Sequence, residues 1–181
     1  MTTTEGSPPD DRRVDLVPVD TERTKMRLLD ESDVDAVHAI LGDEATTADV
    51  SFGQPSREAS AAWVSRRLAQ QRTFGVSMWA VELRSTSELI ALCGFFPVRP
   101  GEVELGYVVS ADHWGQGYAT EVVRAALGVA AAAEQRVIAT IRSTNRRSIG
   151  VARRVGLVET GSVDDDRGRL LVFTAVAPNS R

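Results

Sequence analysis

Short apolar segments bounded by turn residues recur along the chain, and this pattern predicts β-strands. The expected strands are Lys25–Leu29, Val76–Leu83, Leu89–Phe96, Glu102–Val109, Arg136–Arg142, Leu157–Thr160 and Leu170–Ala177. Three of them follow one another as a meander, with turns at residues 85–87 and 97–101. The segment Leu89–Phe96 is apolar on both faces, which is typical of a central strand.

Two helices are predicted in the first half of the chain. The first follows a capping-box pattern made by Ser32 and Asp35, with apolar residues on one face behind it. The second is capped by Ser56 and ends at Gly75. The expected buried positions of the second helix are Ala59, Trp63 and Leu68.

Two further helices are predicted in the second half. One follows the segment Trp114–Thr120 and continues to about Ala133, and the other spans Asn145–Val155 and is ended by Gly156. The first of these carries an apolar stripe that is expected to pack on the sheet, formed by Val122, Val123, Ala126, Leu127 and Ala130.

Length and composition predict one globular domain. The chain has 181 residues, of which 43% are hydrophobic and 25% charged. Residues 1–23 contain six acids and three prolines without an apolar period, so they are expected to form a solvated tail or an extended arm. The folded domain is expected at 24–177, and a short tail at 178–181.

Charge and cysteine content exclude several classes of partner. With 21 basic and 25 acidic residues the net charge is −4, whereas a nucleic-acid-binding protein usually has a basic excess. No apolar run is long enough for a membrane span, and the N-terminus has no secretory signal pattern. One cysteine and two histidines form no metal-binding spacing. We expect a cytoplasmic protein without a metal, and no nucleic acid or membrane as partner.

The segment Trp114-Gly-Gln-Gly-Tyr-Ala-Thr120 is the most informative motif, because it lies between a predicted strand and a predicted helix. Glycines at the start of a helix let backbone N–H groups approach an anion such as a pyrophosphate. On their own, Gly115 and Gly117 are equally consistent with a tight turn. Downstream, Asn145 and Ser148 open the next helix, beside the end of the strand that carries the motif.

Together these motifs resemble the GNAT superfamily of N-acetyltransferases over Thr24–Ala177. Its pattern of Arg or Gln, two residues, Gly, one residue, then Gly or Ala corresponds here to Trp114–Ala119, with tryptophan in the first position. The chain looks most like the branch of ribosomal-protein N-terminal acetyltransferases. The motifs that carry this resemblance are Glu104-Leu-Gly-Tyr107, Trp114–Glu121, Asn145-x-x-Ser148 and Val155-Gly156-Leu157.

The resemblance implies an α/β (α+β) GNAT fold. Its central sheet is mixed and mostly antiparallel, with about seven strands and about four flanking helices, and it is splayed between strands four and five. The implied cosubstrate is acetyl-CoA. The pyrophosphate would be held by Gly115, Gln116, Gly117, Tyr118, Ala119 and Thr120, and the pantetheine arm by the backbone of Tyr107, Val108 and Val109. Asn145 would contact pantetheine, or it is a helix cap.

The implied catalytic residues are Glu104 and Ser148. Many relatives have a tyrosine as general acid where this chain has Ala152, and a base where it has Thr140. Glu104 is therefore the remaining candidate for a base, or else it positions the acceptor. Ser148 is either the acid or an ordinary helical serine.

The implied reaction is direct acetyl transfer to a primary amine, either a protein N-terminal α-amine or a small molecule, by a monomer or homodimer. The acidic run Asp164–Asp166 either attracts a cationic amine or is solvated. One alternative is a catalytically silent acyl-CoA-binding regulator. Another is an NADP-binding protein in which Gly115, Gly117 and Thr120 form the fingerprint and Arg142 meets a 2′-phosphate.

Overall fold

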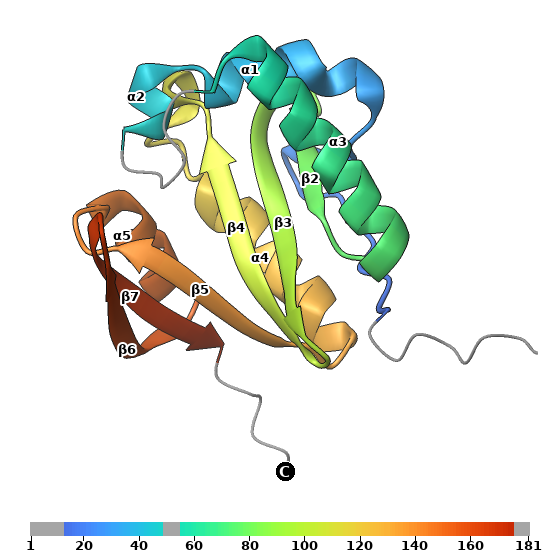
Figure 1. Cartoon of the computed structure of the whole chain (residues 1–181). Helices are drawn as coiled ribbons and strands as arrows, with labels where there is room; N and C mark the ends of the chain where they lie inside the picture. Colours follow the sequence, from blue (N-terminus) through green and yellow to red (C-terminus); the bar gives the residue numbers. More distant parts are fainter. Residues whose placement is uncertain (1–12, 49–54, 176–181) are drawn as a thin grey trace, which may run out of the picture.

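The computed structural model describes residues 13–48 and 55–175, and within them the chain forms seven strands, five α-helices and two 3-10 helices (Figure 1). The strands are β1 (Thr24–Leu28), β2 (Met78–Leu83), β3 (Leu89–Arg99), β4 (Glu102–Val109), β5 (Arg136–Arg142), β6 (Leu157–Asp165) and β7 (Gly168–Ala175). The α-helices are α1 (Val34–Leu41), α2 (Glu44–Thr47), α3 (Arg57–Phe74), α4 (Tyr118–Ala132) and α5 (Arg146–Arg154). The 3-10 helices are η1 (Glu31–Asp33) and η2 (Ala111–His113).

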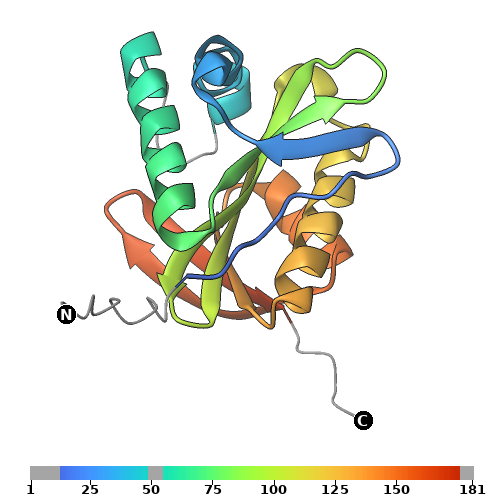
Figure 2. The same ribbon diagram turned by 90° about the vertical axis from the view of Figure 1, so that its right-hand side faces the viewer.

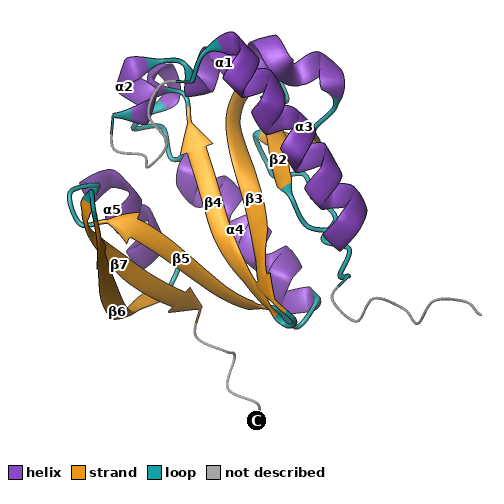
Figure 3. Cartoon of the chain, in the orientation of Figure 1, coloured by secondary structure: helices purple, strands orange, loops and turns teal. Residues whose placement is uncertain are grey.

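All the strands belong to one sheet with the order β1-β2-β3-β4-β5-β7-β6. Neighbouring strands are antiparallel except for β4 and β5, which pair in parallel. Helices α1 and α3 cover one face of the sheet and α4 covers the other, as Figure 3 shows. The expected mixed, mostly antiparallel fold is confirmed. The short helix α2 was not expected; Asp43 caps it by accepting a hydrogen bond from Thr46 N at 2.6 Å.

The sheet separates two hydrophobic clusters. The larger lies between the sheet, α4 and α5, and includes Trp79 and Phe95, whose rings meet edge to face at 5.7 Å. The smaller lies under α1 and α3 and includes Val37, Val64 and Leu92. Most of the stripe expected on α4 is buried in the larger cluster, which confirms that the alanine-rich helix packs closely on the sheet. None of the described helices is both long and apolar enough to cross a membrane.

Residues 13–23 form an extended segment that lies against the domain before β1 begins (Figure 2). Val14 N donates to Phe74 O at 3.1 Å, and Leu16 N donates to Gly75 O at 2.9 Å. The Leu16 side chain is 1% exposed and belongs to the larger cluster. The described part of the expected tail is thus an arm attached to the domain. Residues 1–12 and 176–181 lie outside the described residues, and the domain boundaries stay a prediction.

The start of α1 corrects the sequence prediction. The capping box is formed by Asp30 and Asp33 rather than by Ser32 and Asp35. Asp30 Oδ1 accepts from Ser32 N at 2.7 Å, and Asp33 Oδ2 accepts from Asp30 N at 2.8 Å. The reason is that Asp30 is still extended, with φ −133°, whereas Asp35 lies on the exposed side of the helix and pairs with Arg57.

Helix α3 has the expected ends but a different buried side. Ser56 Oγ accepts from Ala59 N at 3.2 Å, and Gly75 ends the helix with a φ of +69°. Ala59 is exposed, Trp63 and Leu68 are half-buried, and the buried side chains are Ser60 and Val64. The buried side is displaced because α3 packs on α1 as well as on the sheet, where His38 Nδ1 lies 3.1 Å from Ser60 Oγ.

Two strands are longer than the sequence suggested. β3 continues through Pro97 to Arg99, where a turn was expected, because the pairing register with β4 shifts between these residues and accommodates the missing N–H. The last hairpin is also extended, so Asp164 and Asp165 belong to β6 and Asp166 lies in the turn.

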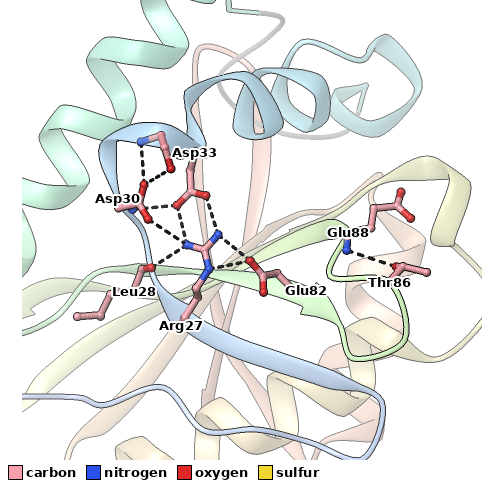
Figure 4. A network of polar contacts seen from close by, with 8 residues as sticks. Arg27, Leu28, Asp30, Asp33, Glu82, Thr86 and Glu88 are labelled. Atoms are coloured by element: carbon pink, nitrogen blue, oxygen red, sulfur yellow. Dashed lines mark hydrogen bonds and ion pairs between the residues drawn. The ribbon is translucent and has the colours of Figure 1, made fainter.

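A buried ion pair ties β1, β2 and η1 together (Figure 4). The guanidinium of Arg27 donates two hydrogen bonds to Asp33, each of 2.7 Å, and its Nε donates to Glu82 at 2.7 Å. The side chain of Asp33 is only 6% exposed. The hydrogen bonds to Asp33 raise the pKa of Arg27 above its usual value, although burial opposes this shift.

We expect Arg27→Met to lower the free energy of unfolding by about 2–3 kcal/mol, because it leaves the buried Asp33 carboxylate without its cation. Arg57→Met is the matched control, since Arg57 and Asp35 form an exposed pair that solvent screens and that should contribute little to stability. Urea unfolding of the two variants measures the difference. Equal losses would show that the Arg27 network adds no more stability than a surface pair.

Candidate functional site

The cleft of this protein originates where β4 and β5 separate. Their parallel pairing covers only Glu102–Glu104 of β4 and Arg136–Ile138 of β5. Beyond this point the strands diverge, and in the described sheet residues 105–109 of β4 have no partner on the β5 side (Figure 1). A strand edge with unpaired N–H and C=O groups can bind an extended ligand through its backbone. The expected splay between strands four and five is confirmed.

A cleft of about 600 Å³ opens at this splay. Its walls come from α2, the end of β4, the segment that leads into α4, the first turn of α4, and one side of α5 along its length. Most of the predicted site residues line it, namely Tyr107, Val108, Val109, Gly115, Gly117, Tyr118, Ala119, Thr120, Asn145 and Ser148. Gln116 is not among the lining residues, and neither is Glu104, which lies where the strands begin to part. That the lining residues bind a cofactor stays a prediction.

The turn before α4 has the conformation that anion binding requires. Gly115 has a φ of +75° and Gly117 a φ of +86°, a region that other residues adopt only with strain. Gly117 is the N-cap of α4. Because glycine has no side chain to cap the helix, the first N–H groups of α4 are available to a ligand. These groups and the helix dipole favour a negative charge at this end of the cleft.

The start of α5 lies across the cleft from this turn. Asn145 Oδ1 accepts from Ser148 N at 3.0 Å, so the amide side chain caps the helix, which is one of its two predicted roles. The hydroxyl of Tyr107 donates to the backbone O of Ser148 at 3.3 Å. Burial raises the pKa of Tyr107 to about 12, and its phenol is therefore neutral at physiological pH. Ala152 is buried on the same helix.

Glu104 lies at the point where β4 and β5 part. Its Oε1 accepts a hydrogen bond of 2.5 Å from Thr140 Oγ1 on β5. Thr140 stands where the resemblance discussed above would imply a base, and its hydroxyl orients the carboxylate of the neighbouring strand instead. Thr140 is exposed and Glu104 half-buried, and their contact followed from neither motif, because it depends on the register between β4 and β5.

The N-terminal arm holds the glycine turn from outside. Arg23 Nη1 donates to the backbone O of Gln116 at 2.9 Å, while its Nε and Nη2 contact Glu121 at 2.7 and 2.6 Å. The same guanidinium lies over the ring of Tyr118, with Cζ 4.3 Å from the ring centroid. Thr21 Oγ1 also donates to Glu121, at 2.5 Å. Although burial acts against ionisation of Glu121, these bonds lower its pKa below the usual value.

Arginines make one side of the cleft mouth positive. Arg146, Arg147 and Arg154 all line the cleft. Arg154 Nε donates to Thr120 Oγ1 at 3.3 Å, and Arg147 Cζ lies 4.0 Å from the ring centroid of Trp114. Such a cluster makes the surroundings of the glycine turn favourable for an anion, although the chain as a whole is acidic.

Arg142 does not reach this cluster. It donates two hydrogen bonds of 2.6 Å to Asp165, and these bonds hold the pKa of Asp165 at about 2. The charge of Asp165 is therefore already balanced, which weakens the expectation that the acidic run attracts a cationic amine. These contacts also count against the alternative of an NADP-binding protein, because Arg142 points to the β6–β7 hairpin. In addition, the glycine turn follows the fourth strand of a mixed sheet.

Several residues of the site were not found from the sequence. Arg23 precedes the expected domain, and Ala45 and Thr46 belong to the unexpected helix α2. Thr46 Oγ1 accepts from Ala111 N at 2.9 Å and so fixes α2 against the end of β4. Nothing in the sequence marks these residues, because each acts through a contact across the fold. In residues 13–48 and 55–175, no group of three or more His, Cys, Asp or Glu could hold a metal ion.

The splayed sheet, the glycine turn and the cleft between them are features of one known class of protein. A family model described as an acetyltransferase (GNAT) domain matches residues 23–158. The chain therefore belongs to the GNAT acetyltransferase family.

Three relatives illustrate this similarity. The Bacillus subtilis protein YkkB is 28% identical over 142 residues, which cover 76% of this chain and 83% of YkkB. A Salmonella typhimurium acetyltransferase described as modifying the N-terminal serine of ribosomal protein L7/L12 aligns with a TM-score of 0.78 at 20% identity, covering 90% of this chain and 99% of that chain. A structure of AAC(6′)-Ib with acetyl-CoA aligns with a TM-score of 0.72 at 18% identity, covering 86% and 94%.

Gly117→Val is expected to raise the Kd for acetyl-CoA roughly tenfold or more, because valine strains the positive φ and displaces the N–H groups at the start of α4. Gly128→Ala in the same helix is the control, since a Cβ there meets no atom within 4 Å. Calorimetric titration measures both affinities. Unchanged affinity in a folded Gly117→Val variant would contradict the assignment of the turn to pyrophosphate.

We expect Arg23→Lys to raise the Kd for acetyl-CoA several-fold while the Kd for acetyl-pantetheine, which lacks the pyrophosphate, changes little. A lysine keeps the charge beside Glu121 but cannot also donate to Gln116 O in the same geometry. Arg84→Lys is the control, because Arg84 contacts the arm at Asp20 and Thr21 without touching the turn. An equal loss with both ligands would mean that Arg23 does not act through the glycine turn.

Proposed function

We propose that this protein transfers the acetyl group of acetyl-CoA to a primary amine by direct attack. The observation that carries the proposal is the cleft itself, which has a helix N-terminus with two glycines at one end and a carboxylate near the other. Relatives support the choice of an amine, because one is described as modifying an N-terminal serine and another as an aminoglycoside acetyltransferase.

The described residues fit acetyl-CoA along the whole cleft. The N–H groups from Gly115 to Thr120 would hold the pyrophosphate, and Arg146, Arg147 and Arg154 would balance its charge. The unpaired edge of β4 from Tyr107 to Val109 would bind the pantetheine arm through its amides. When bound, this cosubstrate supplies the activated acetyl group as a thioester.

Glu104 is the proposed base. The carboxylate accepts a proton from the ammonium form of the acceptor, either directly or through one water, and the neutral amine that results attacks the thioester carbonyl. The proton that the nitrogen loses after the attack balances the one that the departing thiolate gains. Thr140 supports this role, because its hydroxyl bond fixes the direction of the carboxylate. Backbone N–H groups of the unpaired β4 edge are the proposed donors to the oxyanion that forms at the carbonyl.

Ser148 is the proposed proton donor to the departing thiol, since it lines the cleft at the start of α5. We expect its contribution to be small, because a thiolate with a pKa near 8.5, as is typical, leaves readily without protonation at about neutral pH. No covalent acyl-enzyme is needed.

The cost of deprotonation favours an α-amine over a lysine-like amine as acceptor. At pH 7 an amine with a pKa of about 8 costs about 1.4 kcal/mol to deprotonate, whereas one near 10.4 costs about 4.6 kcal/mol. A single carboxylate is better matched to the first. A panel of peptides and small amines with acetyl-CoA, monitored by free-thiol release and product mass, tests the proposal. Tight binding of acetyl-CoA without transfer to any amine would instead favour the catalytically silent regulator.

Glu104→Gln is expected to lower kcat by roughly 10²–10⁴-fold without changing the Kd for acetyl-CoA, because an amide cannot accept the proton. The loss should shrink at higher pH, where more of the amine is already neutral. Thr140→Val, which removes only the bond that orients Glu104, should cause a smaller loss. A pH–rate profile from 6 to 9 for each protein provides the measurement, and wild-type-like rates throughout would contradict the role of Glu104.

A further inference from the structure

Arg67 on α3 extends across the same face of the sheet as Glu104. Its backbone O accepts from Ser77 Oγ at 2.8 Å, next to the start of β2, whereas its guanidinium lies over Phe96 on β3. The distance from Cζ to the centroid of the Phe96 ring is 4.9 Å, and that to the Trp63 ring is 5.6 Å. The side chain therefore runs from β2 toward β4 and is held by two aromatic rings.

Phe96 connects Arg67 with the proposed reaction centre. Phe96 and Glu104 are directly opposite each other in the antiparallel pair β3–β4, so their side chains share one face. Adjacent strands are about 4.8 Å apart. Arg67, Phe96 and Glu104 thus form a row that leads to the edge where β4 and β5 diverge.

The charge of Arg67 is not balanced within the described part of the chain. The guanidiniums of Arg23, Arg27 and Arg142 each have a carboxylate partner. No described carboxylate pairs with Arg67, and its Nε is buried without a hydrogen-bond partner. Burial, and secondarily the neighbouring Arg66, lower its pKa below the usual value.

Glu104 does not supply the missing partner, because its carboxylate is bonded to Thr140 on the other side. A half-buried guanidinium without a counter-ion is unfavourable, and a bidentate carboxylate would compensate it. The two opposite charges at the ends of the row would suit a ligand that carries an amine at one end and a carboxylate at the other.

We propose that Arg67 binds a carboxylate of the acceptor, which makes the acceptor class a primary amine that also bears a carboxylate. The inference rests on the proposed function, since the amine is taken to lie at Glu104. Free amino acids and peptides with an acidic N-terminal residue share this chemistry. Trp63 and Phe96 provide apolar surface beside the carboxylate, and the planar fork of arginine fixes its orientation.

Matched acceptor pairs test the inference. One pair is the peptide amide Glu-Ala and its uncharged analogue Gln-Ala, and the other is alanine and alaninamide, each compared at equal concentration of the neutral amine. We expect the wild type to have a kcat/KM roughly 10- to 100-fold higher for the carboxylate member of at least one pair. A preference within the first pair indicates a peptide acceptor, and a preference within the second indicates a free amino acid.

Arg67→Met keeps the apolar stem and is expected to remove this preference, mainly through KM. Arg67→Lys should retain part of it, and Arg66→Met is the matched control because Arg66 is exposed on the same helix. If the wild type does not prefer the carboxylate, or if Arg67→Met slows both members equally, Arg67 only packs against the rings and the inference is wrong.

A binding measurement separates this inference from the proposed function. Saturation-transfer NMR with the same four acceptors, in the presence of CoA, reports binding without turnover. Carboxylate-selective binding that is lost in Arg67→Met supports the inference, and its absence overturns it. Calorimetry with acetyl-CoA and thiol release in the same samples test the acetyltransferase proposal independently.

Discussion

The cleft exists because β4 diverges from β5 after a short parallel pairing. Because the two parallel strands pair only up to Glu104 and Ile138, the following residues of β4 keep backbone groups that no strand satisfies. Backbone groups at a strand edge that no strand pairs with are available to a ligand, so a sheet that opens in this way is suited to bind an extended molecule there. The same divergence sets Glu104 at the narrow end and leaves the cleft at the wide end, where residues of α4 and α5 line it.

Elements far apart in the sequence hold this opening in place. The arm before β1 contributes Arg23, which joins the carbonyl of Gln116 to the carboxylate of Glu121 and thereby fixes the glycine turn on α4. On the other side, Arg142 and Asp165 tie β5 to the β6–β7 hairpin. At the narrow end Thr140 and Glu104 bridge the two strands just as they part. The cleft is therefore supported on each side by a polar contact, whereas the hydrophobic clusters hold the sheet beneath it.

Local patterns predicted the parts of the site that depend on local structure. The glycines at 115 and 117, the capping position of Asn145 and the boundaries of β5 could be read directly, because turn, cap and strand signals act within a few residues. Leu16 could not, since a single leucine in an acidic segment has no periodic pattern until the arm packs on the domain.

Contacts across the fold explain the remaining differences between the predictions from the sequence and the structure. Ser32 and Asp35 have the spacing of a capping box, but the structure forms the box with Asp30 and Asp33. Arg27 binds Asp33 from β1, and this tertiary contact has no signal in the local sequence. Arg67 is one of several arginines on α3 and becomes distinct only when the sheet places Phe96 beneath it. Tertiary contacts, rather than residue type, therefore determine which polar residues belong to the site.

The unpaired edge of β4 and the turn before α4 are proposed to bind acetyl-CoA together. Amide hydrogen exchange with and without this ligand tests the claim most directly, because it reports on each backbone N–H group. Added protection is expected at residues 106–109 and 115–120, with little change at the opposite sheet edge in β1. Binding without protection at these two segments, or protection confined to another surface, would contradict it.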